Sequence, residues 1–229
     1  MADEAKAIEI DPKNAVAYDN RGNAYLAKGD FDRAIADYTK AIEIDPNDAK
    51  ARHNRGFAYL SQVDLDNAIA DETKAIEIDP KYVGAYNSRG NAYAGKGNVD
   101  RAIADYASAI ELDPKNAGPY NARCWLRATH DRDLPLALAD CDAGDRLAPT
   151  NANILYSRGF VYLRLGRLDE AIADYDAALK INPRQADALY GRGLAKRKKG
   201  DPAGGDADIA AARAIQADIA VDYARYGIN

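Results

Sequence analysis

The sequence predicts an all-α protein, a solenoid of six helix–turn–helix repeats of 34 residues each. The segment KAIEIDP occurs three times, at 6–12, 40–46 and 74–80. Proline recurs with the same period, with one extra residue before the fifth occurrence: Pro12, Pro46, Pro80, Pro114, Pro149 and Pro183. A fixed period of this length indicates a stack of similar supersecondary units, which forms an extended surface rather than a catalytic cleft.

Each repeat is predicted to contain two antiparallel helices in close contact. In the first repeat, Tyr18, Tyr25, Ile35, Tyr38 and Ile42 follow helical spacing. With the proline placed at position 32, three positions carry small residues, which allow the helix backbones to approach each other. Position 8 carries Gly22, Gly56, Gly90, Cys124, Gly159 and Gly193. Position 20 carries Ala34, Ala68, Ala102, Ala137, Ala171 and Gly205, and position 27 carries Ala41, Ala75, Ala109, Gly144, Ala178 and Ala212.

The helix ends are also marked in the sequence. Glycine in the left-handed conformation commonly ends a helix, and asparagine or aspartate commonly caps the start of one. The glycines expected to end first helices are Gly29, Gly97, Gly166 and Gly200. The residues expected to cap helices are Asn14, Asp30, Asp48, Asp64, Asn98, Asn116, Asn151 and Asp201.

The pattern resembles the tetratricopeptide repeat family over nearly the whole chain. The resemblance implies a right-handed superhelix whose first helices line a concave inner surface. Some residues depart from the family pattern. Arg52 and Glu72 replace aromatic residues at positions 4 and 24, and Val63 replaces the glycine at position 15. The sixth repeat departs most, at Lys196, Gly205 and Ala217.

One solenoid domain is predicted over residues 1–229. Residues 14–217 form the full repeats, and residues 218–229 form a capping helix over the exposed face of the sixth repeat. Residues 1–13 match only the second helix of a repeat, so we expect further repeats upstream. The apolar edge of this partial repeat is expected to fray or to pack against a second copy of the chain, which makes it a candidate surface for self-association.

Composition argues against several classes of function. The formal net charge is −5, whereas general nucleic-acid binding needs a positive field. No apolar run is long enough to cross a membrane. Two histidines and two cysteines are too few for a structural zinc site, and neither a catalytic constellation nor a glycine-rich phosphate loop is evident. We therefore expect no enzyme activity, cofactor or metal. No signal peptide is visible, which favours the cytoplasm over export but does not assign a compartment.

The two cysteines belong to the fourth repeat. Cys124 is at position 8 and Cys141 at position 24, so they are expected at a similar height on facing helices. Two buried thiols are favoured, and a disulfide is the alternative in an oxidising compartment.

A charged pair recurs in every repeat. Arginine occupies position 7 and aspartate position 23, which lie at the same level in an antiparallel pair. The favoured interpretation is an ion pair in each repeat, and the alternative is a ladder of arginines for acidic ligands. The pairs are Arg21–Asp37, Arg55–Asp71, Arg89–Asp105, Arg123–Asp140, Arg158–Asp174 and Arg192–Asp208.

The remaining positions of the first helices are candidates for partner binding. Asparagine amides both donate to and accept from a peptide backbone, and exposed aromatic residues are frequent hot spots. The candidates are Asn20, Asn23, His53, Asn54, Phe57, Asn87, Asn91, Asn121, Trp125, Tyr156, Phe160 and Tyr190. Arg164, Arg197 and Lys198 are expected to favour acidic residues of the partner.

The resemblance implies a scaffold that binds a peptide or a helical segment of a partner protein in its concave groove. The alternative is a recognition or self-assembly module of a larger enzyme or of a secretion or assembly machine. Chaperone-adaptor members of the family hold a C-terminal carboxylate with lysine, arginine and asparagine. Here Asn23 and Asn54 match that pattern, but the positions of the three cations hold Asp19, Gly84 and Ser88. The carboxylate-clamp function is therefore not expected.

Overall fold

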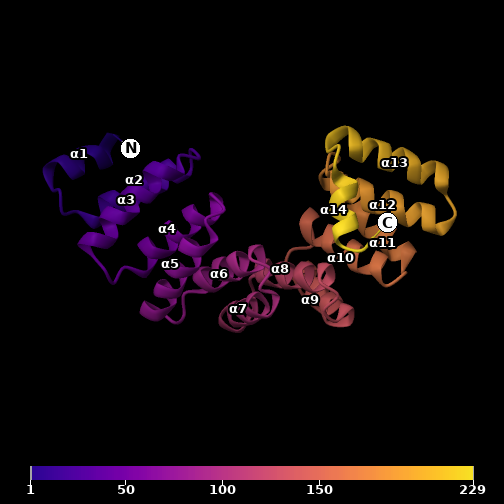
Figure 1. The fold of residues 1–229 in the computed structure, drawn as a ribbon, viewed down its shortest axis with the longest axis horizontal. Coiled ribbons are helices and arrows are strands. Elements are labelled where there is room, and N and C mark those ends of the chain that lie inside the picture. Colours follow the sequence, from indigo (N-terminus) through magenta and orange to yellow (C-terminus); the bar gives the residue numbers. More distant parts are fainter. Residues whose placement is uncertain (1, 229) are drawn as a thin grey trace. The chain divides into compact units, whose positions relative to one another are not determined.

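The computed structural model describes residues 2–228, so Met1 and Asn229 of the predicted domain lie outside the described residues. Residues 2–228 form fourteen α-helices and no strand, and the chain is 78% helical, so the predicted all-α class is confirmed (Figure 1). Contacts divide the chain into two compact units. Unit 1 ends at Asp113 and unit 2 begins at Pro114. The single domain, the number of repeats and the hand of the superhelix stay predictions.

Unit 1 contains one leading helix followed by helices that pack in consecutive pairs, α2 with α3, α4 with α5 and α6 with α7. Each pair contacts the next one through α3 and α4, then through α5 and α6. The leading helix packs on α2 but buries none of its residues. The bounds are α1 Ala2–Ile10, α2 Ala15–Leu26, α3 Phe31–Ile44, α4 Ala49–Ser61, α5 Leu65–Ile78, α6 Val83–Gly95 and α7 Val99–Leu112.

Unit 2 repeats this arrangement and ends in a short helix. Its pairs are α8 with α9, α10 with α11 and α12 with α13, and the last helix, α14, contacts α12 and α13. Figure 1 shows α14, in yellow, running across α12. The bounds are α8 Ala117–Thr129, α9 Leu134–Leu147, α10 Ala152–Arg164, α11 Leu168–Ile181, α12 Ala186–Lys199, α13 Pro202–Ile215 and α14 Ile219–Arg225.

Most of the predicted caps are present. The side chains that accept a backbone N–H at a helix start are those of Asn14, Asp30, Asp48, Asp64, Asn116, Asn151 and Asp201. The expectation for Asn98 is wrong, because it precedes α7 without a side-chain cap bond. Gly29, Gly97, Gly166 and Gly200 have φ between 71° and 98°. Val63, at the equivalent position of the second repeat, has φ 61°, a conformation that costs a residue with a Cβ about 1–2 kcal/mol.

The small residues make room for large ones from the facing helix. Ala34, on α3, is fully buried. A Cβ added at Gly22 or at Gly90 would lie 2.7 Å from the ring of Tyr38 or Tyr106. Position 8 therefore has to be small, because the tyrosine at position 24 fills the space that a side chain there would take.

Each first helix is joined to its second helix by a two-point ion pair. The arginine Nε and Nη2 donate to the two carboxylate oxygens over 2.6–2.9 Å, and all six aspartates are buried. The predicted ion pairs are confirmed: Arg21–Asp37, Arg55–Asp71, Arg89–Asp105, Arg123–Asp140, Arg158–Asp174 and Arg192–Asp208. Aspartates of the chain itself thus neutralise the arginines that the alternative interpretation assigned to acidic ligands.

Several of these arginines also contact the preceding pair of helices. Arg55 Nη1 donates to Thr39 Oγ1 of α3 over 3.0 Å, and Arg89 Nη1 donates to Thr73 Oγ1 of α5 over 3.2 Å. In unit 2, Arg158 reaches Asp145 of α9 at 2.7 Å, and Arg192 reaches Asp176 of α11 at 2.6 Å. One guanidinium therefore connects three helices.

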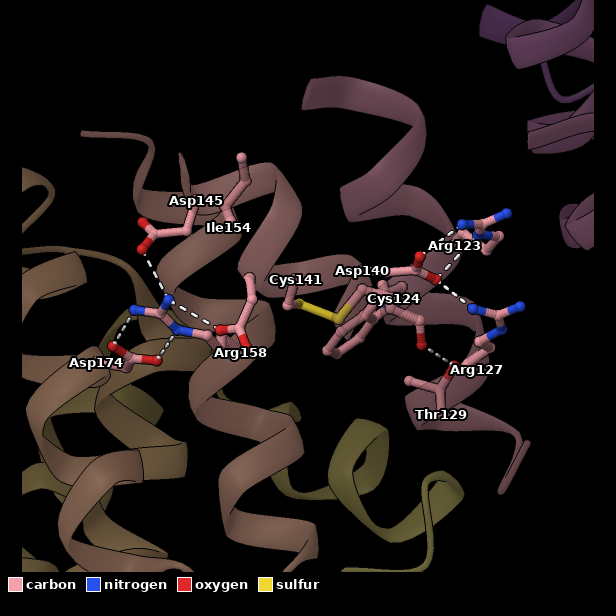
Figure 2. The surroundings of a disulfide bond; sticks show 12 residues. Arg123, Cys124, Arg127, Thr129, Asp140, Cys141, Asp145, Ile154, Arg158 and Asp174 are labelled. Atoms are coloured by element: carbon pink, nitrogen blue, oxygen red, sulfur yellow. Dashed lines mark hydrogen bonds and ion pairs between the residues drawn. A yellow bond between two sulfur atoms is a disulfide. The ribbon is translucent and has the colours of Figure 1, made fainter. Parts of the chain in front are cut away.

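Cys124 of α8 and Cys141 of α9 form a disulfide, with their Cα atoms 5.5 Å apart. The favoured prediction of two thiols is therefore wrong, and the alternative describes the structure. Figure 2 shows the bond beside the Asp140 carboxylate, which Arg123 and Arg127 both contact. The two cysteines occupy positions 8 and 24, where unit 1 places a glycine against a larger side chain, so the disulfide replaces that packing contact.

The ion pairs lead to a prediction about energetic coupling. Arg89→Ala leaves the Asp105 carboxylate buried without its partner, so we expect a loss of about 3 kcal/mol or more in the free energy of unfolding. The double variant Arg89→Ala/Asp105→Ala should lose about 1–3 kcal/mol less than the sum of the two single variants. Urea unfolding followed by circular dichroism measures all three. The exposed pair Lys74–Glu77 is the matched control and should show no measurable coupling. Additive losses at Arg89 and Asp105 would contradict the structural role of the pair.

The disulfide leads to a second prediction. Unfolded protein that has not been reduced should contain no reactive thiol in a titration with a thiol reagent. Reduction should lower the free energy of unfolding by about 3 kcal/mol, because the bond joins residues 17 apart in sequence. The variant Cys124→Ser/Cys141→Ser should be insensitive to reductant. Two reactive thiols in the wild-type chain would show that the bond does not form.

Candidate functional site

The predicted partner-binding residues of unit 1 lie on its first helices, and we call this surface the unit 1 inner face. It comprises Asn20 and Asn23 of α2, His53, Asn54 and Phe57 of α4, and Asn87 and Asn91 of α6. Asn20, Phe57 and Asn91 are exposed, and Phe57 presents 44% of its surface to solvent. The other four are partly buried. The exposed members are the ones that are open to a ligand.

A buried carboxylate engages two of the predicted asparagines. Asp19 is only 4% exposed and accepts hydrogen bonds from Asn54 Nδ2 at 2.7 Å and Asn23 Nδ2 at 3.3 Å. Lys50 Nζ adds an ion pair at 2.8 Å. These three donors satisfy a charge that would otherwise be costly to bury. Asn23 and Asn54 were expected to bond a partner's backbone, but here their amide nitrogens donate to a carboxylate of the chain itself.

Tyrosines of the second helices orient two of the asparagines. The Tyr38 hydroxyl donates to Asn23 Oδ1 and the Tyr106 hydroxyl donates to Asn91 Oδ1, both at 2.8 Å. Burial raises the pKa of both tyrosines, so each hydroxyl stays a donor at neutral pH. With its oxygen engaged in this way, exposed Asn91 has its amide nitrogen left to donate to a ligand.

The second repeat places a carboxylate where its neighbours have a tyrosine. Glu72 is fully buried, and its Oε2 lies 2.9 Å from His53 Nδ1. The His53 ring packs on the Tyr82 ring with centroids 5.0 Å apart. Burial raises the pKa of Glu72 to about 7, and contact with His53 opposes the rise. Asp71 raises it further and Arg89 lowers it.

The predicted aromatic residues of unit 2 lie on its first helices. We call this surface the unit 2 groove. It comprises Trp125 of α8, Tyr156 and Phe160 of α10, and Tyr190 of α12. The structure brings three of them into contact, because the Trp125 ring lies 5.2 Å from Tyr156 and 4.9 Å from Phe160, while Tyr190 is joined to them through the Tyr223 ring. Asn121 of α8 lies near the start of the same face and is partly buried.

The expectation that these aromatic residues are exposed is wrong. Phe160 is completely buried, Tyr156 and Tyr190 are 8% exposed, and Trp125 is partly buried. The cause is the C-terminal segment. The Tyr223 ring of α14 lies 4.7 Å from Tyr190, and α14 thus covers part of the inner face as well as contacting the last repeat. The capping helix predicted over repeat six is present but covers a larger surface than expected.

The three predicted cations of unit 2 differ in accessibility. Arg164 is largely buried, and its Nη1 donates to the carbonyl oxygens of Ala128 at 2.9 Å and Tyr226 at 3.1 Å. Arg197 is exposed and pairs with Asp206 at 3.2 Å. Lys198 is exposed at a pocket that is also lined by Leu163, Arg164, Gly227 and Ile228. Arg164 therefore holds the C-terminal segment, while Lys198 is open to an acidic group.

Residues 2–228 offer neither a metal site nor a membrane-spanning helix. No cluster of three or more histidine, cysteine, aspartate or glutamate side chains that could hold a metal ion was found among them. None of the helices in this part of the chain is both long and apolar enough to span a membrane.

Comparison with known families identifies the fold. Sequence models described as "TPR repeat" match residues 22–63 and 161–200, and models described as "Tetratricopeptide repeat" match residues 5–36, 49–82 and 83–116. Together they cover more than half of the chain. The chain belongs to the tetratricopeptide repeat family. No curated protein sequence matches it.

Solved structures give the same fold. The crystal structure of YrrB, described as a TPR protein with an unusual peptide-binding site, is 25% identical with a TM-score of 0.63, over 82% of this chain and 97% of that one. PilF of Pseudomonas aeruginosa is 16% identical with a TM-score of 0.78, over 93% and 96%. The Cut9–Hcn1 hetero-tetramer of the APC/C is 18% identical with a TM-score of 0.83, over 98% of this chain but 44% of that one. The last two similarities concern the fold alone.

The structure gives a physical reason why a carboxylate clamp is not expected in this tetratricopeptide repeat chain. Asn23 and Asn54, the two residues that match the clamp pattern, both bond the Asp19 side chain. The carboxylate that they hold belongs to the chain itself. Sequence reasoning noted Asp19 as a missing cation but did not foresee its contacts with Lys50 and Asn54, which are 31 and 35 residues away. The tail was expected to cap the sixth repeat, but the packing of Tyr226 on Trp125 and Phe160 was not foreseen.

The buried glutamate gives a prediction about pH. Its folded pKa of about 7 lies above the 4.5 of a free glutamate, so the neutral form stabilises the fold. This contribution is complete below about pH 4.5 and is lost as the pH rises through 7. Glu72→Gln keeps a group that hydrogen-bonds His53 but does not titrate. At pH 8 it should be more stable than the wild type, by about 1–3 kcal/mol, and at pH 4.5 the two should be equal. Thermal unfolding across this range tests it, with exposed Glu77→Gln as the control. Parallel pH profiles for wild type and Glu72→Gln would contradict it.

Proposed function

We propose that this chain is a non-catalytic scaffold that binds a peptide or helical segment of a partner protein along the inner faces of its first helices. Tetratricopeptide repeat proteins are generally interaction scaffolds, and the similar YrrB structure is described as having a peptide-binding site. The observation that carries the proposal is the chemistry of the unit 1 inner face. There Phe57 is exposed, and the amides of Asn54 and Asn91 on the same face are held in place by the chain.

The side chains of unit 1 have complementary roles in this proposal. Phe57 provides an apolar contact area at the middle of α4. Asn91, oriented by Tyr106, donates its amide nitrogen to a backbone carbonyl of the partner. Exposed Asn20 offers both a donor and an acceptor at the other end of the face. These groups suit a segment whose backbone is accessible, as it is in an extended peptide.

The remaining charged groups support a structural role instead of catalysis. The six buried aspartates are all paired with arginines, and Asp19 is paired with Lys50. A catalytic acid or base needs access to a substrate, and a group enclosed in a two-point ion pair has none. Binding should be modest, with a Kd on the order of micromolar, because an extended segment loses entropy when it is ordered.

Substitution of exposed residues tests the proposal. A partner captured by the wild-type chain is identified, and its binding segment is titrated by calorimetry against purified variants. Asn20→Ala/Phe57→Ala should weaken binding at least about tenfold, equivalent to 1.4 kcal/mol, with an unchanged melting temperature because both side chains are exposed.

The matched control is Leu112→Ala, a comparably exposed apolar residue (38%) on the second helix α7. It should leave the affinity within about twofold. Hydrogen exchange should show protection by the segment on α2, α4 and α6. Protection confined to α3, α5 and α7, or equal affinities for all variants, would refute the proposal.

A further inference from the structure

The unit 2 groove already holds a short peptide segment, and that segment is the end of the chain itself. Residues Ile219 and Tyr223 of α14 are completely buried, and Ile228 beyond it is 7% exposed. The opposite side of α14 is open, since Val221 is 52% exposed. One face of α14 is therefore buried in the groove and the other faces solvent, as in a peptide helix bound to a protein.

Two tyrosines of the segment anchor it on the aromatic residues of the groove. The Tyr223 ring lies 4.7 Å from Tyr190 and 5.8 Å from Phe160. The Tyr226 ring lies edge-on to Trp125 at 5.4 Å and to Phe160 at 5.8 Å. Aromatic pairs at these separations are favourable beyond their buried area. Phe160 therefore contacts both tyrosines, which are three residues apart.

Polar groups of the groove fix the position of the segment. Arg164 Nη1 donates to the Tyr226 carbonyl oxygen at 3.1 Å, and the Tyr223 hydroxyl donates to the Asp187 carbonyl oxygen at 2.8 Å. Gly191 makes room for two tyrosine side chains, because a Cβ there would lie 2.5 Å from the Tyr175 hydroxyl and 2.7 Å from the Tyr223 hydroxyl. The bond from the Tyr223 hydroxyl favours a tyrosine at this point over any apolar residue, whereas the bond to the Tyr226 carbonyl fixes only the backbone.

The segment has little stability of its own. A helix of seven residues does not persist alone in water, so α14 depends on its docking contacts. Burial raises the pKa of the partly buried Asp187 carboxyl of α12, and the charge of Asp222 of α14 raises it further. Like charges brought together in this way favour release of the segment.

We propose that the unit 2 groove is a binding site for a short helical segment that carries two aromatic residues three positions apart, and that α14 occupies this site until such a segment of a partner displaces it. This inference rests on the proposed scaffold function. It names the chemistry of the ligand that unit 2 would bind. The partner's first aromatic residue takes the place of Tyr223 against Tyr190, and the second takes the place of Tyr226 against Trp125. Arg164 then donates to a backbone carbonyl oxygen of the partner in place of that of Tyr226.

Trp125 is the only tryptophan of the chain and reports directly on the groove. The probe is a synthetic peptide of residues 216–229, added to the full-length chain. The variant Tyr223→Ala/Tyr226→Ala removes both anchors and should release α14, which shifts Trp125 emission to longer wavelength. The peptide should bind this variant, restore the wild-type emission, and bind the wild type at least about tenfold more weakly because α14 competes.

Two controls make the result specific. Val221→Ala/Arg225→Ala changes the solvent-facing side of the same helix and should keep wild-type emission and weak peptide binding. A peptide with alanine at both tyrosine positions should not bind the vacated groove. Circular dichroism establishes that the variants stay folded. Should the tyrosine variant unfold, hydrogen exchange on the wild type decides: the amides of α14 should exchange at least about tenfold faster than those of α10 and α12.

Three outcomes would overturn the inference. The first is a folded tyrosine variant that does not bind the peptide. The second is equal binding of the peptide to wild type and variant, because the site would then lie outside the groove. The third is protection of α14 as strong as that of α10, because α14 would then be a permanent cap. The test uses the chain's own segment and no natural partner, so its result is independent of the Phe57 experiment on unit 1.

Discussion

The two-point arginine–aspartate pair is the interaction on which the rest of each unit depends. Its geometry fixes the position of the first helix along the second, because two nitrogens of one planar guanidinium each donate to one of the two carboxylate oxygens. The remaining nitrogen of Arg55 and of Arg89 reaches the preceding second helix. Within each unit the pair therefore specifies both the fold of a repeat and its contact with its neighbour. Buried pairs of this kind fix geometry more than they add stability.

With the helices held in this register, position 24 decides the chemistry of the inner face. A tyrosine there fills the space over the glycine at position 8, and its hydroxyl reaches position 9 of the first helix, as Tyr38 and Tyr106 do with Asn23 and Asn91. The second repeat has Glu72 at position 24 and Phe57 at position 9. The glutamate bonds His53 instead, and Phe57 is left exposed. Two linked substitutions, one in the buried layer and one on the surface, thus change which groups this repeat offers.

Much of this architecture could be predicted from the sequence, because it depends on contacts at fixed spacing. The arginine and aspartate of a pair are 16 residues apart in most repeats, and caps and glycines act within one turn of the chain. Asp19 and α14 could not be placed in this way. Asp19 is bound by a residue of the next repeat, Lys50. Arg164 donates to the Tyr226 carbonyl oxygen, 62 residues away, and this separation is not a multiple of the repeat length. Val63 shows the converse, since the left-handed turn forms there without the glycine that predicts it.

The two inner faces therefore differ in kind: that of unit 1 is polar and open, and that of unit 2 is aromatic and covered. Occupation of the unit 2 groove by α14 lowers the apparent affinity of the groove for other ligands. A groove that is occupied by its own segment for 99% of the time weakens every competing ligand by about a hundredfold, since only the vacant fraction binds. A weak aromatic segment is then excluded at ordinary concentrations. A segment that is also held at a second site gains an effective concentration that offsets the competition. Under this proposal, the tail would make the aromatic surface favour ligands that make a second contact as well.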